Sequence, residues 1–391
     1  MRILIGTEQW FPDYVGGTAR VARETAFALA GRGHHVSVVA PASVGKAKHE
    51  RCGYVDVHRV VPRSVLPKTW SDAALFRRHL APLVDSHDVL LLHHAIIAAA
   101  MAFRRSSIPI AYVFHASPLR EARHRRASGI STSQQIKSLA VEPVLALAEA
   151  LAASRCDAIL ALSNFSRDLI VSDHPLSADR IRLVSGGVNT KAHSPSSDRD
   201  SLRRDMGLGP GELLLLTVRR LVPRMGVENL VRAMAELKAV DRRSLRLFVV
   251  GDGELRRRLE VLTHELGMSS TISFLGAVSD EQVQNLYRAA DLFLLPTTAY
   301  EGFGIATVEA LASGTPVVGT PGGATPEILG PLDRDLLALD ASPAGLAAAI
   351  RRGLDLSTAS FRDVCRGYAE RHFAWETVIV GWEEALRGLV R

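Results

Sequence analysis

The sequence predicts an α/β protein with two doubly wound, Rossmann-like domains that face a central cleft. Short β-branched or leucine-rich runs alternate with longer helical patterns, which is typical of parallel sheets flanked by helices. The runs are apolar on both sides of each strand, as expected where helices cover both faces of a sheet. The alternation stops near the middle of the chain and restarts, and 391 residues fit two domains at about 150 residues each.

The first domain is expected over residues 1–190. Its first strand, Arg2–Gly6, leads into a helix at Thr18–Arg32, where alanine and leucine recur at helical spacing. Its further strands are expected at His35–Ala40, Asp88–His93, Ile108–His115, Asp157–Ser163 and Arg180–Val184. Ligands of such sheets bind at the carboxyl ends of the strands.

Residues 191–211 are expected to connect the domains, because turn-forming and charged residues dominate this stretch. One short helix is expected inside it, around Asp200–Met206. The second domain is expected over residues 212–371. Its strands are expected at Leu213–Val218, Leu245–Val250, Ile272–Leu275, Asp291–Leu295 and Pro316–Gly319, and its helices near Val227–Lys238, Glu254–Leu266, Asp280–Ala289 and Gly304–Ala312.

The last segment, from Glu370 to Arg391, is a continuous helical pattern with Trp375 and Trp382 on one apolar stripe. Two placements stay open for residues 372–391. This helix either closes the second domain or packs back on the first.

The composition excludes several classes of protein. The 47 basic residues outnumber the 41 acidic ones, for a net charge of +6, which favours anionic ligands such as phosphates. The sequence has no zinc-finger spacing, helix-turn-helix signature or aromatic-basic RNA motif, so we expect no nucleic-acid partner. Three widely spaced cysteines make neither a disulfide framework nor a metal site. No run approaches the roughly 20 apolar residues of a membrane span, so we expect a cytoplasmic protein with at most peripheral contact at the inner face of the membrane.

The strongest functional signal is the segment Glu301-Gly-Phe-Gly-Ile-Ala-Thr-Val-Glu309, which follows a predicted strand and opens a helix. Free N–H groups of Phe303, Gly304 and Ile305, together with the positive end of the helix, suit an anion. Ionised Glu301 and Glu309 can accept hydrogen bonds from hydroxyl groups. This bend therefore predicts a site for a phosphate and a sugar.

With four further segments, the bend resembles the family 4 retaining glycosyltransferases of the GT-B fold. These segments are Gly251-Asp-Gly-Glu-Leu255, Phe274-Leu-Gly276, Asp291-Leu-Phe-Leu-Leu-Pro296 and Gly314-Thr-Pro-Val-Val318. The match covers nearly all of residues 210–330. It is less dense in the first half, through Gly16-Gly17-Thr-Ala-Arg20, His115 and Gly187-Val188-Asn189. The resemblance implies retaining transfer of a hexose from a nucleoside-diphosphate sugar to an acceptor hydroxyl.

The resemblance also implies roles for residues of both domains. Glu309 would bind the ribose of the nucleotide and Glu301 the hydroxyls of the transferred sugar, with the amides of the bend near the diphosphate. His115 would hydrogen-bond the donor sugar, which makes His115 and Glu301 the expected catalytic residues. Gly16 and Gly17 would let the backbone approach a phosphate at a helix end.

The pair Arg220 and Met225 aligns with an arginine and a lysine that grip the diphosphate in the family. Here the sequence departs from the pattern, because a thioether cannot offset phosphate charge. Two alternatives stay open: the neighbouring Arg224 reaches in, or the helix dipole and the amides of the glycine loop suffice. Arg120 and Arg123 follow His115 at helical spacing and are either a solvated face or an acceptor-side patch for an anionic group or membrane surface.

No cofactor beyond the donor and no metal are expected, since amides and arginine can meet the leaving diphosphate. The acceptor is unassigned, with a lipid and a natural-product scaffold as candidates. One alternative is a catalytically weak or inactive nucleotide-sugar-binding homologue. A nucleotide-dependent oxidoreductase or epimerase is less favoured, because neither strand–helix junction has the dinucleotide glycines.

Overall fold

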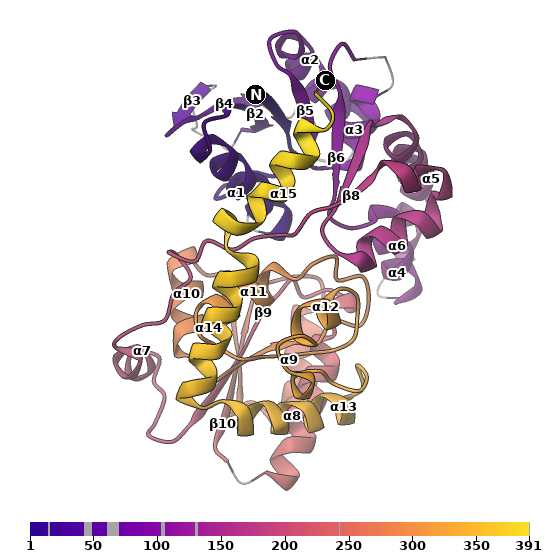
Figure 1. The fold of residues 1–391 in the computed structure, drawn as a ribbon. Helices are drawn as coiled ribbons and strands as arrows, with labels where there is room; N and C mark the ends of the chain where they lie inside the picture. Colours follow the sequence, from indigo (N-terminus) through magenta and orange to yellow (C-terminus); the bar gives the residue numbers. More distant parts are fainter. Residues whose placement is uncertain are drawn as a thin grey trace. The chain divides into compact units, whose positions relative to one another are not determined.

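The computed structural model describes residues 1–14, 16–42, 49–60, 70–102, 106–129, 132–241 and 243–390. The chain forms two compact units (Figure 1). Unit 1 consists of Met1–Gly187 together with Trp375–Arg391, and unit 2 is Val188–Ala374.

Unit 1 is built on an eight-stranded sheet in the order β3-β4-β2-β1-β5-β6-β7-β8. Every pair is parallel except β3 with β4. The strands are β1 (Arg2–Gly6), β2 (His35–Pro41), β3 (His49–Cys52), β4 (Val55–Val60), β5 (Val89–Leu92), β6 (Ile110–Phe114), β7 (Ala158–Ala161) and β8 (Ile181–Leu183).

The sequence pattern missed β3 and β4. Strand β3 is a run of four mostly charged residues, and β4 alternates buried Val55 and Val57 with less buried Asp56 and His58. Strand β3 is an edge strand and β4 lies next to it, between β3 and β2, and neither has the two-sided apolar signature of a strand covered on both faces.

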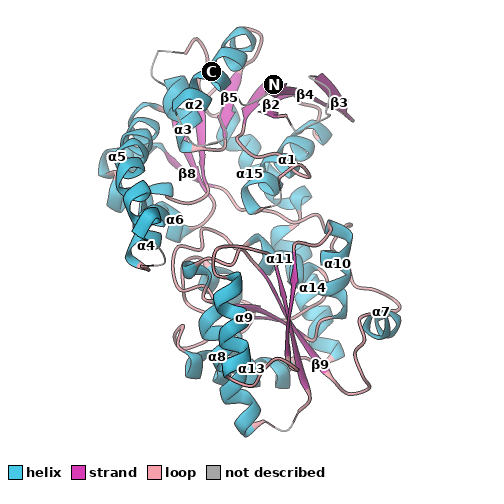
Figure 2. Ribbon diagram, turned by 180° about the vertical axis from the view of Figure 1, so that it is seen from behind, coloured by secondary structure: helices cyan, strands magenta, loops and turns pink. Residues whose placement is uncertain are grey.

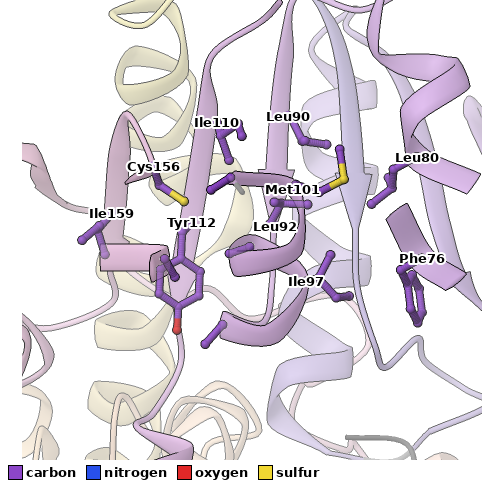
Figure 3. Close-up of a cluster of buried hydrophobic side chains, with 14 of the residues drawn as sticks. Phe76, Leu80, Leu90, Leu92, Ile97, Met101, Ile110, Tyr112, Cys156 and Ile159 are labelled. Atoms are coloured by element: carbon purple, nitrogen blue, oxygen red, sulfur yellow. The ribbon is translucent and has the colours of Figure 1, made fainter. Parts of the chain in front are cut away.

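Helices cover the sheet of unit 1, and the core lies between them and the central strands. The helices are α1 (Gly17–Gly31), α2 (Trp70–Val84), α3 (Ala95–Ala102), α4 (Pro118–Ala127), α5 (Thr132–Arg155), α6 (Asn164–Asp173) and α15 (Trp375–Arg387). Figure 3 shows part of this core, where side chains of β5, β6, β7, α2 and α3 gather. Its labelled members are Phe76, Leu80, Leu90, Leu92, Ile97, Met101, Ile110, Tyr112, Cys156 and Ile159.

The C-terminal helix α15 belongs to unit 1 and packs on α1 (Figure 1). Trp382 is fully buried and donates its indole N–H to the carbonyl oxygen of Ser185 at 2.8 Å. Glu383 forms ion pairs with Arg32 at 2.5 Å and with His34 at 3.1 Å. These contacts fix the apolar stripe of the helix on unit 1.

The prediction of one continuous helix from Glu370 onward was wrong. Helix α14 ends at Phe373, and Ala374 has an extended conformation with φ −58° and ψ 136°. The N–H of Val188 donates to the carbonyl oxygen of Phe373 at 2.7 Å, and Val188 forms a parallel bridge with Ala374. The chain is therefore extended at the point where it leaves unit 2.

Unit 2 is built on a five-stranded parallel sheet in the order β11-β10-β9-β12-β13. Figure 2 shows the sheet between α8, α9 and α13 on one side and α10, α11 and α14 on the other. The strands are β9 (Leu213–Val218), β10 (Leu245–Val250), β11 (Ile272–Gly276), β12 (Leu292–Leu295) and β13 (Val317–Gly319). The helices are α7 (Arg199–Asp205), α8 (Val227–Val240), α9 (Arg256–Glu265), α10 (Asp280–Ala289), α11 (Ile305–Ala312), α12 (Thr325–Leu329), α13 (Pro343–Leu356) and α14 (Ala359–Phe373).

Residues 191–211, expected as a connection, lie within unit 2. Their short helix α7 is held at the start of β12, because Arg199 and Arg203 contact the two carboxylate oxygens of Asp291 at 2.6 and 2.8 Å. This segment is part of the folded unit.

The order of strands reverses once in each sheet next to its first strand. Strand β1 lies between β2 and β5, and β9 lies between β10 and β12. In doubly wound sheets, the carboxyl ends of the strands at such a reversal are where ligands bind. The loops after β1, β5, β9 and β12 are therefore the places to look for a site.

Replacing the buried Trp382 of α15 tests whether the last helix stabilises unit 1. We expect Trp382→Ala to lower the free energy of unfolding by about 3–5 kcal/mol, because a large buried side chain is lost. The exposed Glu384→Ala on the same helix is the control and should change it by less than about 0.5 kcal/mol. Urea unfolding followed by circular dichroism measures both, and equal effects would contradict the docking of α15.

Candidate active site

The bend after β12 in unit 2 has an unusual backbone. Tyr300 has φ 59°, which is uncommon for a bulky residue and is usually held in place by surrounding contacts. Here the N–H of Ala324 donates to the carbonyl oxygen of Glu301 at 2.8 Å. A Cβ on Gly323 would lie 2.3 Å from that same oxygen. The loop after β13 therefore packs directly on the bend and needs glycine there.

The carboxylate of Glu301 is fixed through one oxygen. Its Oε2 accepts from Arg219 Nη2 at 2.5 Å and from Thr297 Oγ1 at 3.1 Å. Burial alone would raise the pKa of Glu301, but the charges of Arg219 and Arg224 and the hydrogen bonds from Arg219 and Thr297 lower it below its usual value. Oε1 has no hydrogen-bond partner among the residues that the structure describes. An ionised carboxylate with one open oxygen suits a hydroxyl donor.

The amides at the start of α11 complete the bend. Gly304 has φ 92° and precedes the helix, which runs from Ile305 to Ala312. Within the described part of the chain, no group accepts from the N–H groups of Phe303, Gly304 and Ile305. These donors lie at the positive end of the helix dipole, as the sequence pattern predicts, and such donors favour an anion.

The arginines near the bend have different surroundings, and the expected role of Arg220 at the diphosphate stays a prediction. Arg220 is exposed and does not contact Glu301, whereas Arg219 is buried against it. Arg224 is buried, with Nη1 3.5 Å from the carbonyl oxygen of Tyr300. The Sδ atom of Met225 lies 3.1 Å from Arg219 Nη2.

Sequence reasoning missed Arg219 although the doublet Arg219-Arg220 directly follows β9. Neighbouring side chains at a strand end point to opposite sides. Only one member of such a doublet can face the bend, and spacing alone does not say which one.

Glu309 lies on α11 and is buried, rather than open towards the start of the helix as expected. Its Oε2 accepts from the hydroxyl of Tyr287 on α10 at 3.1 Å, and its Oε1 lies 3.6 Å from His193 Nε2. A hydroxyl that binds Glu309 must share this carboxylate with Tyr287. Its ribose role stays a prediction.

In unit 1, His115 follows β6 and meets His93, which follows the neighbouring strand β5. Nε2 of His115 lies 3.0 Å from Nδ1 of His93. His93 is fully buried, and its ring stacks near that of Trp382. Burial lowers the pKa of His115 to about 3, with a smaller contribution from His94. His94 itself pairs with Glu8, which follows β1, at 3.1 Å. His115 is therefore neutral near pH 7, held through one ring nitrogen.

Gly16, which precedes α1, is free of steric demands from the described protein. The helix begins at Gly17, and Gly16 has an extended φ of 163°. A Cβ on Gly16 would meet no described atom closer than 3.8 Å. Neither conformation nor packing therefore requires glycine at this position, which leaves close approach of a ligand as a reason for it.

The two arginines of the expected acceptor-side patch both have acidic partners. Arg120 makes a two-pronged contact with Asp173, at 2.8 and 2.5 Å. Arg123 lies 3.9 Å from Glu142, which also pairs with Arg126 at 2.7 Å. The carboxylates of Asp173 and Glu142 offset part of the positive charge of α4. A role for Arg120 and Arg123 towards an acceptor or an anionic surface stays a prediction.

Among the described residues, no group of three or more histidine, cysteine, aspartate or glutamate side chains is arranged to hold a metal ion. Among those same residues, none of the helices has the length and hydrophobicity needed to cross a bilayer.

Comparisons with known proteins assign the chain to a family. Residues 15–192 match the model described as Glycosyltransferase Family 4, and residues 198–372 match the model described as Glycosyl transferases group 1. An uncharacterized glycosyltransferase of Methanocaldococcus jannaschii is 28% identical over 397 residues, covering 97% of each chain. A D-inositol 3-phosphate glycosyltransferase of Nocardia farcinica is 40% identical over 146 residues, which are 36% of this chain and 32% of that protein.

Solved structures agree on the fold. Sucrose-phosphate synthase from Thermosynechococcus elongatus has a TM-score of 0.83 at 20% identity, covering 100% of this chain and 99% of its own. Anabaena HepE in complex with UDP-glucose has a TM-score of 0.77 at 19% identity, covering 100% of both chains.

The fold and the two family models define a sugar-transferring enzyme of the GT-B class. The chain belongs to the family 4 glycosyltransferases. The predictions of fold class and family are confirmed.

The low pKa of His115 has a consequence for stability. In the unfolded chain, this histidine has a pKa of about 6.5 and is protonated below that pH. In the folded protein, His115 becomes protonated only near pH 3. Stability from this residue is therefore present above about pH 6.5 and is lost as the pH falls. We expect the free energy of unfolding to be about 2 kcal/mol lower at pH 5 than at pH 7.5 because of this residue.

Urea unfolding at both pH values of the wild type and His115→Gln measures this loss. The variant should lose that part of the pH dependence, whereas His264→Gln, at an exposed position of α9, is the control. An unchanged pH dependence in His115→Gln would argue against a buried neutral imidazole.

Proposed function

We propose that the protein transfers a hexose from a nucleoside-diphosphate sugar to an acceptor hydroxyl with retention of the anomeric configuration. The observation that carries this proposal is the bend after β12. It combines open amides, an ionised Glu301 with one open oxygen, and two arginines at the reversal point of the sheet. The family assignment supports the reaction class, and the UDP-glucose complex of HepE supports the class of donor.

The chemistry of the bend fits a leaving diphosphate. As the bond between the anomeric carbon and the phosphate oxygen breaks, negative charge grows on the phosphate. The amides of Phe303, Gly304 and Ile305 and the arginine charges can stabilise it. The open Oε1 of Glu301 would accept from sugar hydroxyls. These groups supply the positive charge that the step needs, so we propose a reaction that requires no bound metal.

Glu301 is poorly suited to be a nucleophile, because the charges of Arg219 and Arg224 and the hydrogen bonds from Arg219 and Thr297 lower its pKa. A carboxylate with a lowered pKa is less basic and therefore a weaker nucleophile. We therefore propose, as the resemblance implies, that the acceptor oxygen attacks on the face from which the phosphate departs. The new bond forms between acceptor oxygen and anomeric carbon, and the acceptor proton passes to the leaving phosphate oxygen.

His115 would act as a neutral hydrogen-bond donor towards the sugar. Nε2 of its neighbour His93 is buried and has no hydrogen-bond partner in the described ranges. Buried N–H groups without an acceptor are rarer than buried acceptors without a donor. We infer that His93 carries its proton on Nδ1 and donates to His115 Nε2, which leaves the proton of His115 on Nδ1.

Turnover of defined donors tests the proposed function. We expect hydrolysis or transfer with at least one of UDP-, GDP- and ADP-hexoses, unaffected by EDTA, and an α-linked product from an α-linked donor by proton NMR. Glu301→Gln should lower kcat by about 100-fold or more, because a charged partner for the sugar is lost, while Glu265→Gln, at an exposed position of α9, should not. Tight nucleotide binding without any turnover would favour the inactive homologue, and a β-linked product would exclude retention.

A pair of variants of equal size tests the proton assignment of His93. The asparagine side chain in His93→Asn keeps an N–H donor near the position of Nδ1. The carboxylate in His93→Asp can only accept a hydrogen bond, so the proton of His115 would move to Nε2. We expect His93→Asn to keep kcat within about tenfold and His93→Asp to lose more than that. Nitrogen-15 NMR of labelled histidine reads the proton position directly. A wild-type His115 with its proton on Nε2 would refute the assignment.

A further inference from the structure

The guanidinium of Arg219 is only partly satisfied within the protein. Its side chain is 5% exposed. Nη2 contacts both Glu301 Oε2 and Met225 Sδ. Nη1 is buried and has no hydrogen-bond partner in the part of the chain that the structure describes. A buried, unpaired N–H of a charged group is costly, and such groups in native proteins usually have a function or a missing ligand.

The position of this guanidinium is informative. The Sδ atom of Met225 takes the place that Cδ has in a lysine side chain. With single bonds near 1.5 Å, a lysine ammonium would lie about 2.5 Å further along. Nη2 of Arg219 lies 3.1 Å from Sδ. The arginine from the end of β9 therefore brings its charge close to Met225 Sδ, within the range of distances that an ammonium group at position 225 would span.

Positive charge from two side chains acts at this end of the bend. Arg219 and Arg224 both lower the pKa of Glu301. The open amides at the start of α11 belong to the same bend. The unbranched Met225 side chain contacts both guanidinium groups, and such a side chain can change its conformation at small cost when a ligand binds beside it.

We propose that Arg219 is the diphosphate-binding cation of this site, with Nη2 on Glu301 and Nη1 donating to the phosphate next to the sugar. This proposal rests on the proposed function and specifies which residue grips the donor. Arg219 thus links the two parts of the donor: it orients the carboxylate that binds the sugar and binds the phosphate that leaves.

Exchanging the two side chains tests this proposal. The variants are Arg219→Met, Met225→Lys and the double exchange that combines both substitutions. Arg243→Met is the control, since Arg243 also pairs with a largely buried carboxylate, Asp241, elsewhere in unit 2. The probes are UDP, GDP and ADP and the corresponding monophosphates, titrated by calorimetry, with thermal melting as the check on folding.

We expect Arg219→Met to weaken diphosphate binding by about 10- to 100-fold, the value of a charge-assisted hydrogen bond. Monophosphate binding should stay within about twofold, because the monophosphate lacks the phosphate that Arg219 meets. The double exchange should recover diphosphate affinity to within about threefold of the wild type. Met225→Lys alone should lower the melting temperature, since it crowds two cations. The same substitution should raise it when added to Arg219→Met, where the introduced lysine gains Glu301 as its partner.

Three other outcomes would contradict this proposal or a part of it. Diphosphate binding that is unchanged in Arg219→Met, or weakened equally for monophosphates, would overturn the proposal while leaving the proposed function intact. A double exchange no better than Arg219→Met would show that the two side chains do not share one position. A wild-type protein that binds none of the diphosphates would overturn both the proposed function and this inference.

Discussion

The ion pair between Arg219 and Glu301 is the interaction on which the donor site depends. The two residues follow β9 and β12, which are neighbours where the strand order reverses. Parallel strands end at the same edge of a sheet, so loops distant in sequence meet there. The pair keeps Glu301 ionised despite its burial, fixes one oxygen and leaves the other open. Without Arg219, only Arg224 and Thr297 would remain to lower the pKa of this carboxylate against the effect of burial.

The same arrangement recurs in unit 1. His93 and His115 follow adjacent strands β5 and β6, and each fixes one ring nitrogen of the other. In both units, a side chain at one strand end is oriented by a side chain from the next strand and keeps one polar atom for a ligand. A glycosyltransferase needs such orientation because catalysis depends on polar groups that are already in place when charge develops. Burial excludes water, which makes these few groups effective.

Much of the fold could be predicted from the sequence, because interior parallel strands are short apolar runs and the bend Glu301–Glu309 has glycines where the backbone needs them. Strands β3 and β4 could not, since β3 is mostly polar and β4 alternates valine with polar residues, so neither is an apolar run. The break at Ala374 depends on contact with Val188, far away in the sequence. Arg219 was missed for a related reason: its role depends on a partner 82 residues later, and the doublet Arg219-Arg220 does not reveal which arginine faces that partner.

The most direct test of this account is a crystal structure of the protein with a non-hydrolysable nucleoside-diphosphate sugar. The account predicts sugar hydroxyls on Glu301 Oε1 and the diphosphate on the amides of Gly304 and Ile305. It also predicts Arg219 Nη1 on the phosphate nearest the sugar, with Nη2 still on Glu301. A diphosphate held by Arg220 with Arg219 uninvolved, or a ligand bound away from the bend, would contradict it.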